Sequence, residues 1–219
     1  MAKAALYTLI GDVIESRRSA NRVELQEHLK AALATVNGLY GTRKPLEATI
    51  GDEFQGCFMS AAEATGASLL LRLQLLGAGV DTRYGLGFGE VMVFTRRVPV
   101  TQDGPGWWAA RDAIDACREL AEQPSSHYVR TYFFGGEDWP RERRGEEAAL
   151  NSFLLCRDAM VDRMKRQTRN RLYGLLLGKS QAEIAAEEGT TQGAVSQSLS
   201  RSNAFAVLAS QRQLEGLFQ

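Results

Sequence analysis

The sequence of 219 residues has no excess of either charge and no long apolar run. It holds 26 Lys and Arg against 26 Asp and Glu, so its formal net charge is zero. This balance excludes a polybasic nucleic-acid coat or an acidic solvating tail as the main character of the chain. The most apolar stretch, residues 67–80, is interrupted by Arg72 and Gln74, which argues against a membrane-spanning helix.

Cysteine and histidine are also scarce. The three cysteines, Cys57, Cys117 and Cys156, are an odd number and lack the spacing of a metal site. The two histidines likewise have no partner at metal-ligand spacing. The apolar stretch at residues 4–10 is shorter than a signal peptide requires. We therefore expect reduced thiols in a cytoplasmic protein.

What the sequence does contain is an ordinary globular composition, 44% hydrophobic and 24% charged. Strand patterns occur at residues 5–10, 46–50, 54–58, 83–94 and 128–134, and helix patterns at residues 21–39, 60–76 and 107–122. A turn at residues 51–53 joins the second and third strands into a hairpin. The βαββαβ order that results is that of a ferredoxin-like sheet.

The second part of the chain has a different pattern. After residue 140 a charged run follows, and from there to the end helix and turn signals replace strand signals. We therefore predict an α+β protein with a ferredoxin-like sheet domain over residues 1–145 and an all-α domain over residues 146–219.

Two predicted strand ends carry acidic residues. Asp12 follows the first strand, and Asp52 lies in the hairpin turn, so this fold would place them on neighbouring strands. Two carboxylates together with phosphate oxygens suit Mg²⁺ and phosphoryl chemistry. The backbone N–H groups of Ile14, Glu15 and Ser16 lead toward a helix start, where they would hold phosphates. The alternative is that Asp and Gly serve these turns for local reasons only.

A glycine-rich stretch at residues 85–89 alternates Gly with Leu and Phe inside a predicted strand. It lacks the Gly-Lys-[Ser/Thr] of a P-loop, so it is not one. Two explanations stay open: close backbone packing in the sheet, or room beside a ligand.

Three segments together resemble the SatD family of bacterial proteins, and a reduced form of the class III nucleotidyl cyclases. They read Leu-Ile-Gly-Asp-Val-Ile-Glu-Ser-Arg (residues 9–17), Thr-Ile-Gly-Asp-Glu-Phe-Gln-Gly (49–56) and Arg-Tyr-Gly-Leu-Gly-Phe-Gly-Glu (83–90). The SatD resemblance covers the whole chain, and the cyclase resemblance covers about residues 5–135. The cyclase resemblance implies a sheet of the cyclase or palm type.

This resemblance also implies roles for individual residues. Asp12 and Asp52 would be the metal ligands, and Arg111 would stabilise charge on the triphosphate in the transition state. The nucleotide contacts would be Ile14, Glu15, Ser16 and Glu53. The cyclase helix motif Asn-x-Ala-x-Arg is only partly kept, because Trp107 stands where the Asn belongs. An indole donates a hydrogen bond but accepts none, so the resemblance favours a nucleotide–metal fold over cyclisation itself.

The strongest local signal lies near the end of the chain. Ser180 and Glu183 form a capping box at a helix start, Gly189 marks a tight turn, and Val195 and Leu199 are inward positions of a second helix. This pattern resembles the helix-turn-helix of sigma-factor region 4, whose second helix would enter the major groove of DNA. The alternative is an ordinary αα-hairpin. The residues expected to contact DNA are Thr191, Gln192, Ser196, Gln197, Ser200 and Arg201.

Charge is split modestly between the two parts. From residue 160 onward the chain holds eight basic and five acidic residues. A basic cluster at residues 163–171 precedes the helix-turn-helix pattern. This cluster would hold DNA phosphates or would be a solvated helix face.

These patterns favour a DNA-binding transcriptional regulator, with a sheet domain that binds a nucleotide and Mg²⁺ or that mediates a homodimer. The rival interpretation is an Mg-dependent nucleotidyl cyclase or nucleotidyltransferase acting on an NTP. A third is a protein-interaction module that has kept the sheet without its chemistry. DNA, a nucleotide and a second copy of the chain are the expected partners, and a membrane is not.

Overall fold

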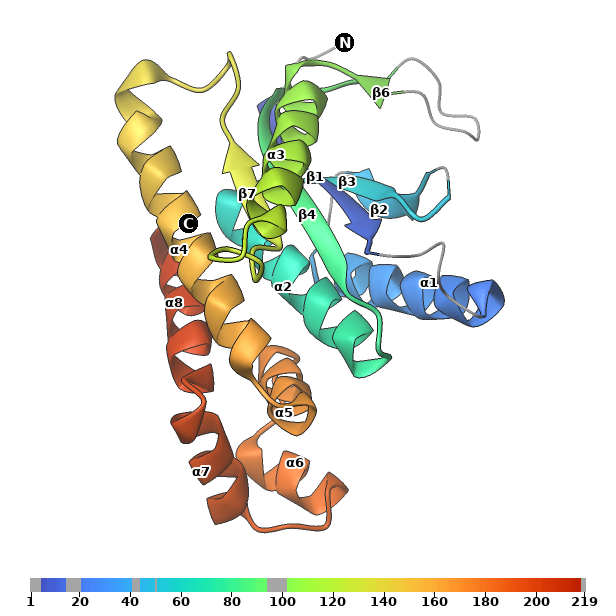
Figure 1. Ribbon diagram of the computed structural model, residues 1–219, viewed down its shortest axis with the longest axis vertical. Coiled ribbons are helices and arrows are strands. Elements are labelled where there is room, and N and C mark those ends of the chain that lie inside the picture. The colour runs from blue at the N-terminus through green and yellow to red at the C-terminus, as the bar shows by residue number, and fades with distance from the viewer. Residues whose placement is uncertain (1–4, 15–20, 41–43, 50, 94–101, 218–219) are drawn as a thin grey trace.

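The computed structural model describes residues 5–14, 21–40, 44–49, 51–93 and 102–217. It is an α+β fold in which one sheet carries helices on both faces and a group of helices extends along the long axis of the molecule (Figure 1). The expected Glu15, Ser16 and residue 50 fall outside the described residues. None of the helices described combines the length and apolar character needed to cross a membrane.

The main sheet has five strands in the order β2-β3-β1-β4-β7. They are β1 (Ala5–Val13), β2 (Lys44–Ala48), β3 (Phe54–Phe58), β4 (Thr82–Glu90) and β7 (Thr131–Phe134). β1 runs antiparallel to β3 and to β4, and β7 extends the sheet parallel to β4. A small ribbon pairs β5 (Met92–Val93) with β6 (Gln102–Asp103). The βαββαβ order predicted from the sequence is confirmed.

Three helices cover the sheet. They are α1 (Arg22–Leu39), α2 (Ala61–Gly77) and α3 (Pro105–Glu122). Local caps explain where two of them begin, because the side chains of Asn21 and Ser60 accept the backbone N–H groups of Glu24 and Glu63. Odd-numbered residues of β1 pack toward α1 and α2, and even-numbered ones pack toward α3.

The glycines of β4 allow α3 to lie directly on that strand. A Cβ added at Gly85 would lie 2.1 Å from the carbonyl oxygen of Ala110, and one added at Gly87 would lie 2.4 Å from the Ala110 nitrogen. Only glycine allows two backbones to approach so closely. Of the two explanations left open by the sequence, the structure supports close packing.

The remaining helices form the extension. They are α4 (Arg144–Arg163), α5 (Arg166–Leu176), α6 (Gln181–Glu187), α7 (Gln192–Arg201) and α8 (Ala204–Leu217), preceded by a 3-10 turn at Arg141–Arg143. α6 and α7 lie at the end of the long axis opposite the sheet, and α8 returns alongside α4 (Figure 1). Leu69 and Leu73 of α2 belong to the apolar core of these helices. Helix α2 therefore contributes to the core beneath the sheet and to the core of the helical extension. The boundary between two domains at residues 145 and 146 stays a prediction.

A buried ion network ties the sheet to the extension. The side chains of Arg72 on α2 and of Arg157 and Asp158 on α4 are each about 1% exposed. Asp158 Oδ1 lies 3.3 Å from an Nη of Arg72 and 3.1 Å from an Nη of Arg157, and its Oδ2 accepts the backbone N–H of Arg130. Burial lowers the pKa of the Arg157 guanidinium, and the charge of Asp158 opposes that shift.

The outer edge of β7 is closed by the same helix. The amide of Asn151 on α4 accepts the N–H of Phe133 and donates to its carbonyl oxygen, both at 2.9 Å. A side chain thus takes the place of a further strand on an edge that would otherwise be free to pair.

Candidate functional site

Asp12 lies at the end of β1 on the face covered by α3. It is paired in register with Arg83 of β4. Its Oδ2 lies 3.5 Å from an Nη of Arg83 and 3.2 Å from an Nη of Arg118, which reaches across from α3. Its Oδ1 is buried, as is Nε of Arg83, and neither atom has a hydrogen-bond partner among the described residues. Such atoms cost free energy unless a bound group satisfies them.

A second ion pair connects the turn between β2 and β3 to helix α3. Both carboxylate oxygens of Glu53 accept from Arg111, each at 2.8 Å. This hydrogen bonding is the main cause of the raised pKa of Arg111. By the register that pairs Gly11 with Phe54, the position opposite Asp12 is Glu53 and not Asp52. Asp52 is half-buried one residue further into the turn.

The remaining residues expected at this site are placed as follows. The backbone N–H of Ile14 donates to the carbonyl oxygen of Asp81 at 3.0 Å, so it is already occupied. Trp107 is buried in the small core between β1 and α3, whereas Trp108 is 55% exposed and its indole N–H donates to Asp103 at 2.7 Å. The position where the cyclase motif has its Asn therefore serves packing here.

The carboxylates and arginines gathered around Asp12 suit a metal ion only in part. Within the described ranges, no group of three or more His, Cys, Asp and Glu side chains is arranged to hold a metal ion. One oxygen of Asp12 is bound by two arginines, and the other has no partner among the described residues. Mg²⁺ is usually held by one or two carboxylates, with water and substrate phosphates completing its shell. The cluster thus fits Mg²⁺ carried by phosphates, and does not fit a resident ion held by protein alone.

Two arginines of this cluster were not predicted from the sequence. Arg83 pairs with Asp12 across the sheet, and Arg118 lies seven residues after Arg111 on α3. Residues seven apart share one face of a helix, so this spacing was a usable signal. Arg83 could be placed only once the register of β1 and β4 was known.

The second group of expected residues lies on α6 and α7. Ser180 and Glu183 form the predicted capping box, Gly189 has a φ of +63°, and the Thr191 hydroxyl accepts the N–H of Ala194 at 3.2 Å. Val195 and Leu199 are fully buried. The two helices and the turn between them are therefore formed as the sequence predicts. Of the expected DNA contacts, Ser196 is half-buried, and the exposed ones are Thr191, Gln192, Gln197, Ser200 and Arg201.

The basic cluster at residues 163–171 is only partly available. Arg171 is buried and paired with Glu188, whose pKa is lowered chiefly by this hydrogen bonding, and Arg169 donates to the carbonyl oxygens of Val161 and Asp162. These two arginines hold the helices together, which corrects the expectation that the whole cluster faces phosphates. The exposed members without a partner among the described residues are Arg163, Lys165 and Arg166.

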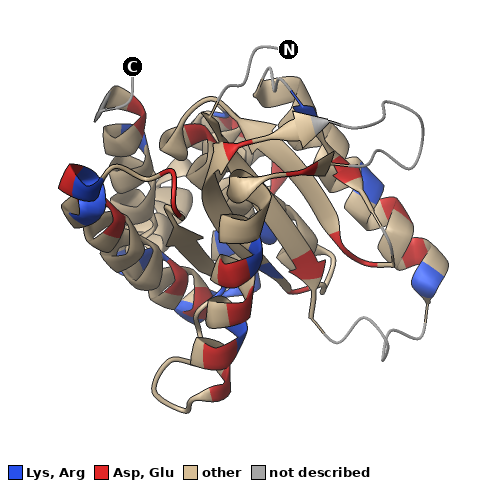
Figure 2. Cartoon of the chain, turned by 90° about the horizontal axis from the view of Figure 1, so that it is seen from above, with Lys and Arg blue, Asp and Glu red and all other residues tan. Residues whose placement is uncertain are grey.

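Charge is otherwise mixed over the surface. Lys and Arg are interspersed with Asp and Glu along the helices, whereas strands β3 and β7 carry neither (Figure 2). The cations beside α7 that make no ion pair with a described residue are therefore a local feature of a chain that is neutral overall.

The fold and its two clusters define an α+β protein in which a sheet with a carboxylate–arginine cluster is joined to a helical unit. A family model described as the SatD family matches residues 6–202, and the chain belongs to that family. A search of curated proteins found no match.

Several solved structures are similar to about half of the chain. The guanylyl cyclase Cya2 is 16% identical, over 52% of this chain and 71% of that one, with a TM-score of 0.42. A bacterial light-regulated adenylyl cyclase is 17% identical, over 55% and 74%, with a TM-score of 0.46. The adenylyl cyclase CyaB from P. aeruginosa is 15% identical, over 50% and 70%, with a TM-score of 0.36.

Proposed function

We propose that this protein is a DNA-binding regulator whose helix α7 enters the major groove. The observation that carries the proposal is the exposed polar face of α7 beside cations that have no partner in the described part of the chain. Buried Val195 and Leu199 fix the opposite face of the helix on its own core, so the polar face is held outward. The three cysteines form no disulfide, and free thiols are what we expect of a regulator in the reducing cytoplasm.

The side chains on this face suit base recognition. The amides of Gln192 and Gln197 can each make two hydrogen bonds to adenine, and Arg201 can do the same with guanine. The short Ser200 lets the helix approach the base edges closely. Two copies of the chain would double the contacts of a weakly charged surface and would set the spacing of two half-sites. The sheet half would supply that dimer contact.

We expect Gln197→Glu to weaken binding to duplex DNA by about tenfold or more, because the new carboxylate meets phosphates and base acceptors. Fluorescence anisotropy of the full chain with a labelled pool of duplexes at low salt measures this loss. The matched control is Gln213→Glu at an exposed position of α8, which makes the same change away from α7. Equal affinities for the two variants would contradict the role of α7.

A second candidate function has its own observation. Oδ1 of Asp12 and Nε of Arg83, which have no hydrogen-bond partner among the described residues, lie in one cluster with Arg118. A nucleotide with Mg²⁺ would satisfy these atoms, with Asp12 and Asp52 as metal ligands and the arginines on the phosphates. The family resemblance also implies nucleotide contacts at Glu53 and Ile14, which hold Arg111 and the carbonyl oxygen of Asp81 instead in this structure, and at Glu15 and Ser16. Nucleotide binding would change DNA affinity only if it favours one of two dimer states.

Calorimetric titration of the chain with each of the four NTPs and Mg²⁺ tests this candidate. We expect binding to one of them, and Asp12→Asn should weaken it about tenfold or more, since a metal ligand is lost. Asp112→Asn, an exposed acid on another side of α3, is the control. Chromatography of the same mixtures shows whether a cyclic or transferred product forms. Absence of binding to any of the four nucleotides would exclude the site.

A further inference from the structure

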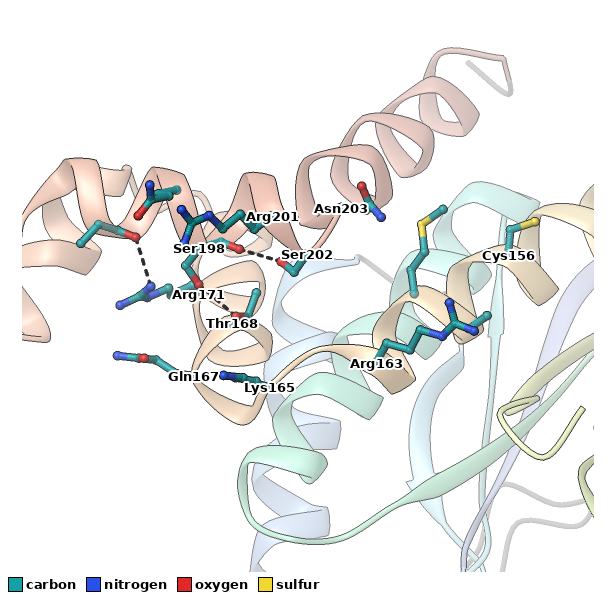
Figure 3. A pocket seen from close by; sticks show the side chains of 14 residues that line it. Cys156, Arg163, Lys165, Gln167, Thr168, Arg171, Ser198, Arg201, Ser202 and Asn203 are labelled. Carbon is teal, nitrogen blue, oxygen red and sulfur yellow. Dashed lines mark hydrogen bonds between the residues drawn. The ribbon is translucent and has the colours of Figure 1, made fainter. Parts of the chain in front are cut away.

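A cleft of about 800 Å³ lies between the end of α4, the start of α5 and one flank of α7 (Figure 3). The side chains of Arg163, Lys165 and Arg201 line it, from the two ends of the α4–α5 junction and from α7. Its described lining residues include no carboxylate. Two separate segments, the α4–α5 junction and α7, thus bring three cations to one concave surface.

These three cations are not neutralised within the described residues. Each of them is exposed and makes no ion pair there, in contrast to Arg171 in the same cleft, which is paired with Glu188. Like charges gathered in a concave surface focus a positive potential and attract an anion. The start of α5 adds to this field, because it has no side-chain cap.

The cleft is held in a fixed relation to α7. The hydroxyls of Thr168 on α5 and Ser198 on α7 are hydrogen-bonded at 3.0 Å on its floor, as Figure 3 shows. Gln197 and Arg201 belong both to the rim of the cleft and to the exposed face of α7. A polyanion seated in the cleft would therefore run alongside the groove that α7 enters.

We propose that this cleft seats the phosphate backbone of the DNA strand that flanks α7, an inference that rests on the proposed function. Arg163 and Lys165 then contribute affinity without sequence preference, and the exposed face of α7 contributes the preference. This division separates positioning contacts from base contacts within one surface.

The salt dependence of DNA binding tests the proposal. We expect the double variant Arg163→Gln/Lys165→Gln to reduce the slope of log K against log salt by about 1.8, since each lost phosphate contact accounts for about 0.9. Arg212→Gln, at an exposed position of α8, should leave the slope unchanged. Both changed residues are exposed, so circular dichroism should show an intact fold.

Cys156 offers an independent reporter, because it lines the cleft and is exposed. Burial raises the pKa of Cys57 and of Cys117 to about 12, so these thiols should not react in the folded chain. Saturating duplex DNA should slow alkylation of Cys156 severalfold in the unmodified protein. Alkylation slowed by pyrophosphate but not by DNA would assign the cleft to a small phosphorylated ligand and overturn the proposal.

Two failures can be told apart. An unchanged slope in the double variant, with DNA still bound, overturns the cleft assignment and leaves α7 as the DNA contact. If the unmodified chain binds no duplex at the lowest salt, both the cleft assignment and the proposed function are wrong.

Discussion

Replacing Asp158 by alanine is expected to lower the free energy of unfolding by about 3–5 kcal/mol, because it leaves the buried guanidinium of Arg157 without a carboxylate and Arg72 with only the longer ion pairs to Asp81 and Asp162. Arg72 and Arg157 are both fully buried, and Asp158 is the carboxylate that contacts both. Asp158→Asn should also be costly, since an amide NH₂ would have to face the N–H of Arg130 or a guanidinium. Urea denaturation of each variant measures the loss.

The control for this prediction is Asp115→Ala. Asp115 also pairs with an arginine, Arg118, at 2.8 Å, but both side chains are nearly half exposed. An exposed pair of this kind contributes about 0–1 kcal/mol. Equal losses for the Asp158 and Asp115 variants would show that burial of the network does not set its energy.

The second large effect is expected for Gly85→Ala. The added methyl group would lie 2.1 Å from the carbonyl oxygen of Ala110 and 2.4 Å from the nitrogen of Ile114, and both are backbone atoms. Helix α3 would have to move away from β4, at a cost of about 1–3 kcal/mol or more. Thermal or urea unfolding measures this cost.

Gly38→Ala is the matched control for the glycine of β4. Gly38 lies near the end of α1 with open space around it, so the added methyl group meets nothing within 4 Å. Alanine there should raise the free energy of unfolding by about 0.5–1 kcal/mol, because glycine is a weak helix former. Destabilisation of similar size at both positions would contradict the packing explanation.

Local features of the fold were predictable from the sequence. The strand and helix order follows from hydrophobic periodicity, and the cap at Ser180 follows from the spacing of Ser180 and Glu183, three positions apart. Contacts between distant residues were not predictable in this way. Arg72 and Asp158 are 86 positions apart, and no local pattern marks them as partners.

The candidate sites show the same limit. The sequence indicated α7 and its exposed face, because the inward positions of a helix follow from its period. It could not distinguish Arg163, which lines an open cleft, from Arg171, whose partner Glu188 is brought close only by the packing of α5 against α6. The register between β1 and β4 was equally needed to place Arg83 beside Asp12.

Sequence-specific DNA binding by α7 can be measured by repeated selection of duplexes from a random-sequence pool, using the intact chain at low salt. We predict that the retained pool converges on a short sequence motif, and that affinity for this motif falls steeply as salt is raised. Failure of the chain to retain any duplex, at the lowest salt at which it stays folded, would contradict DNA binding as its function.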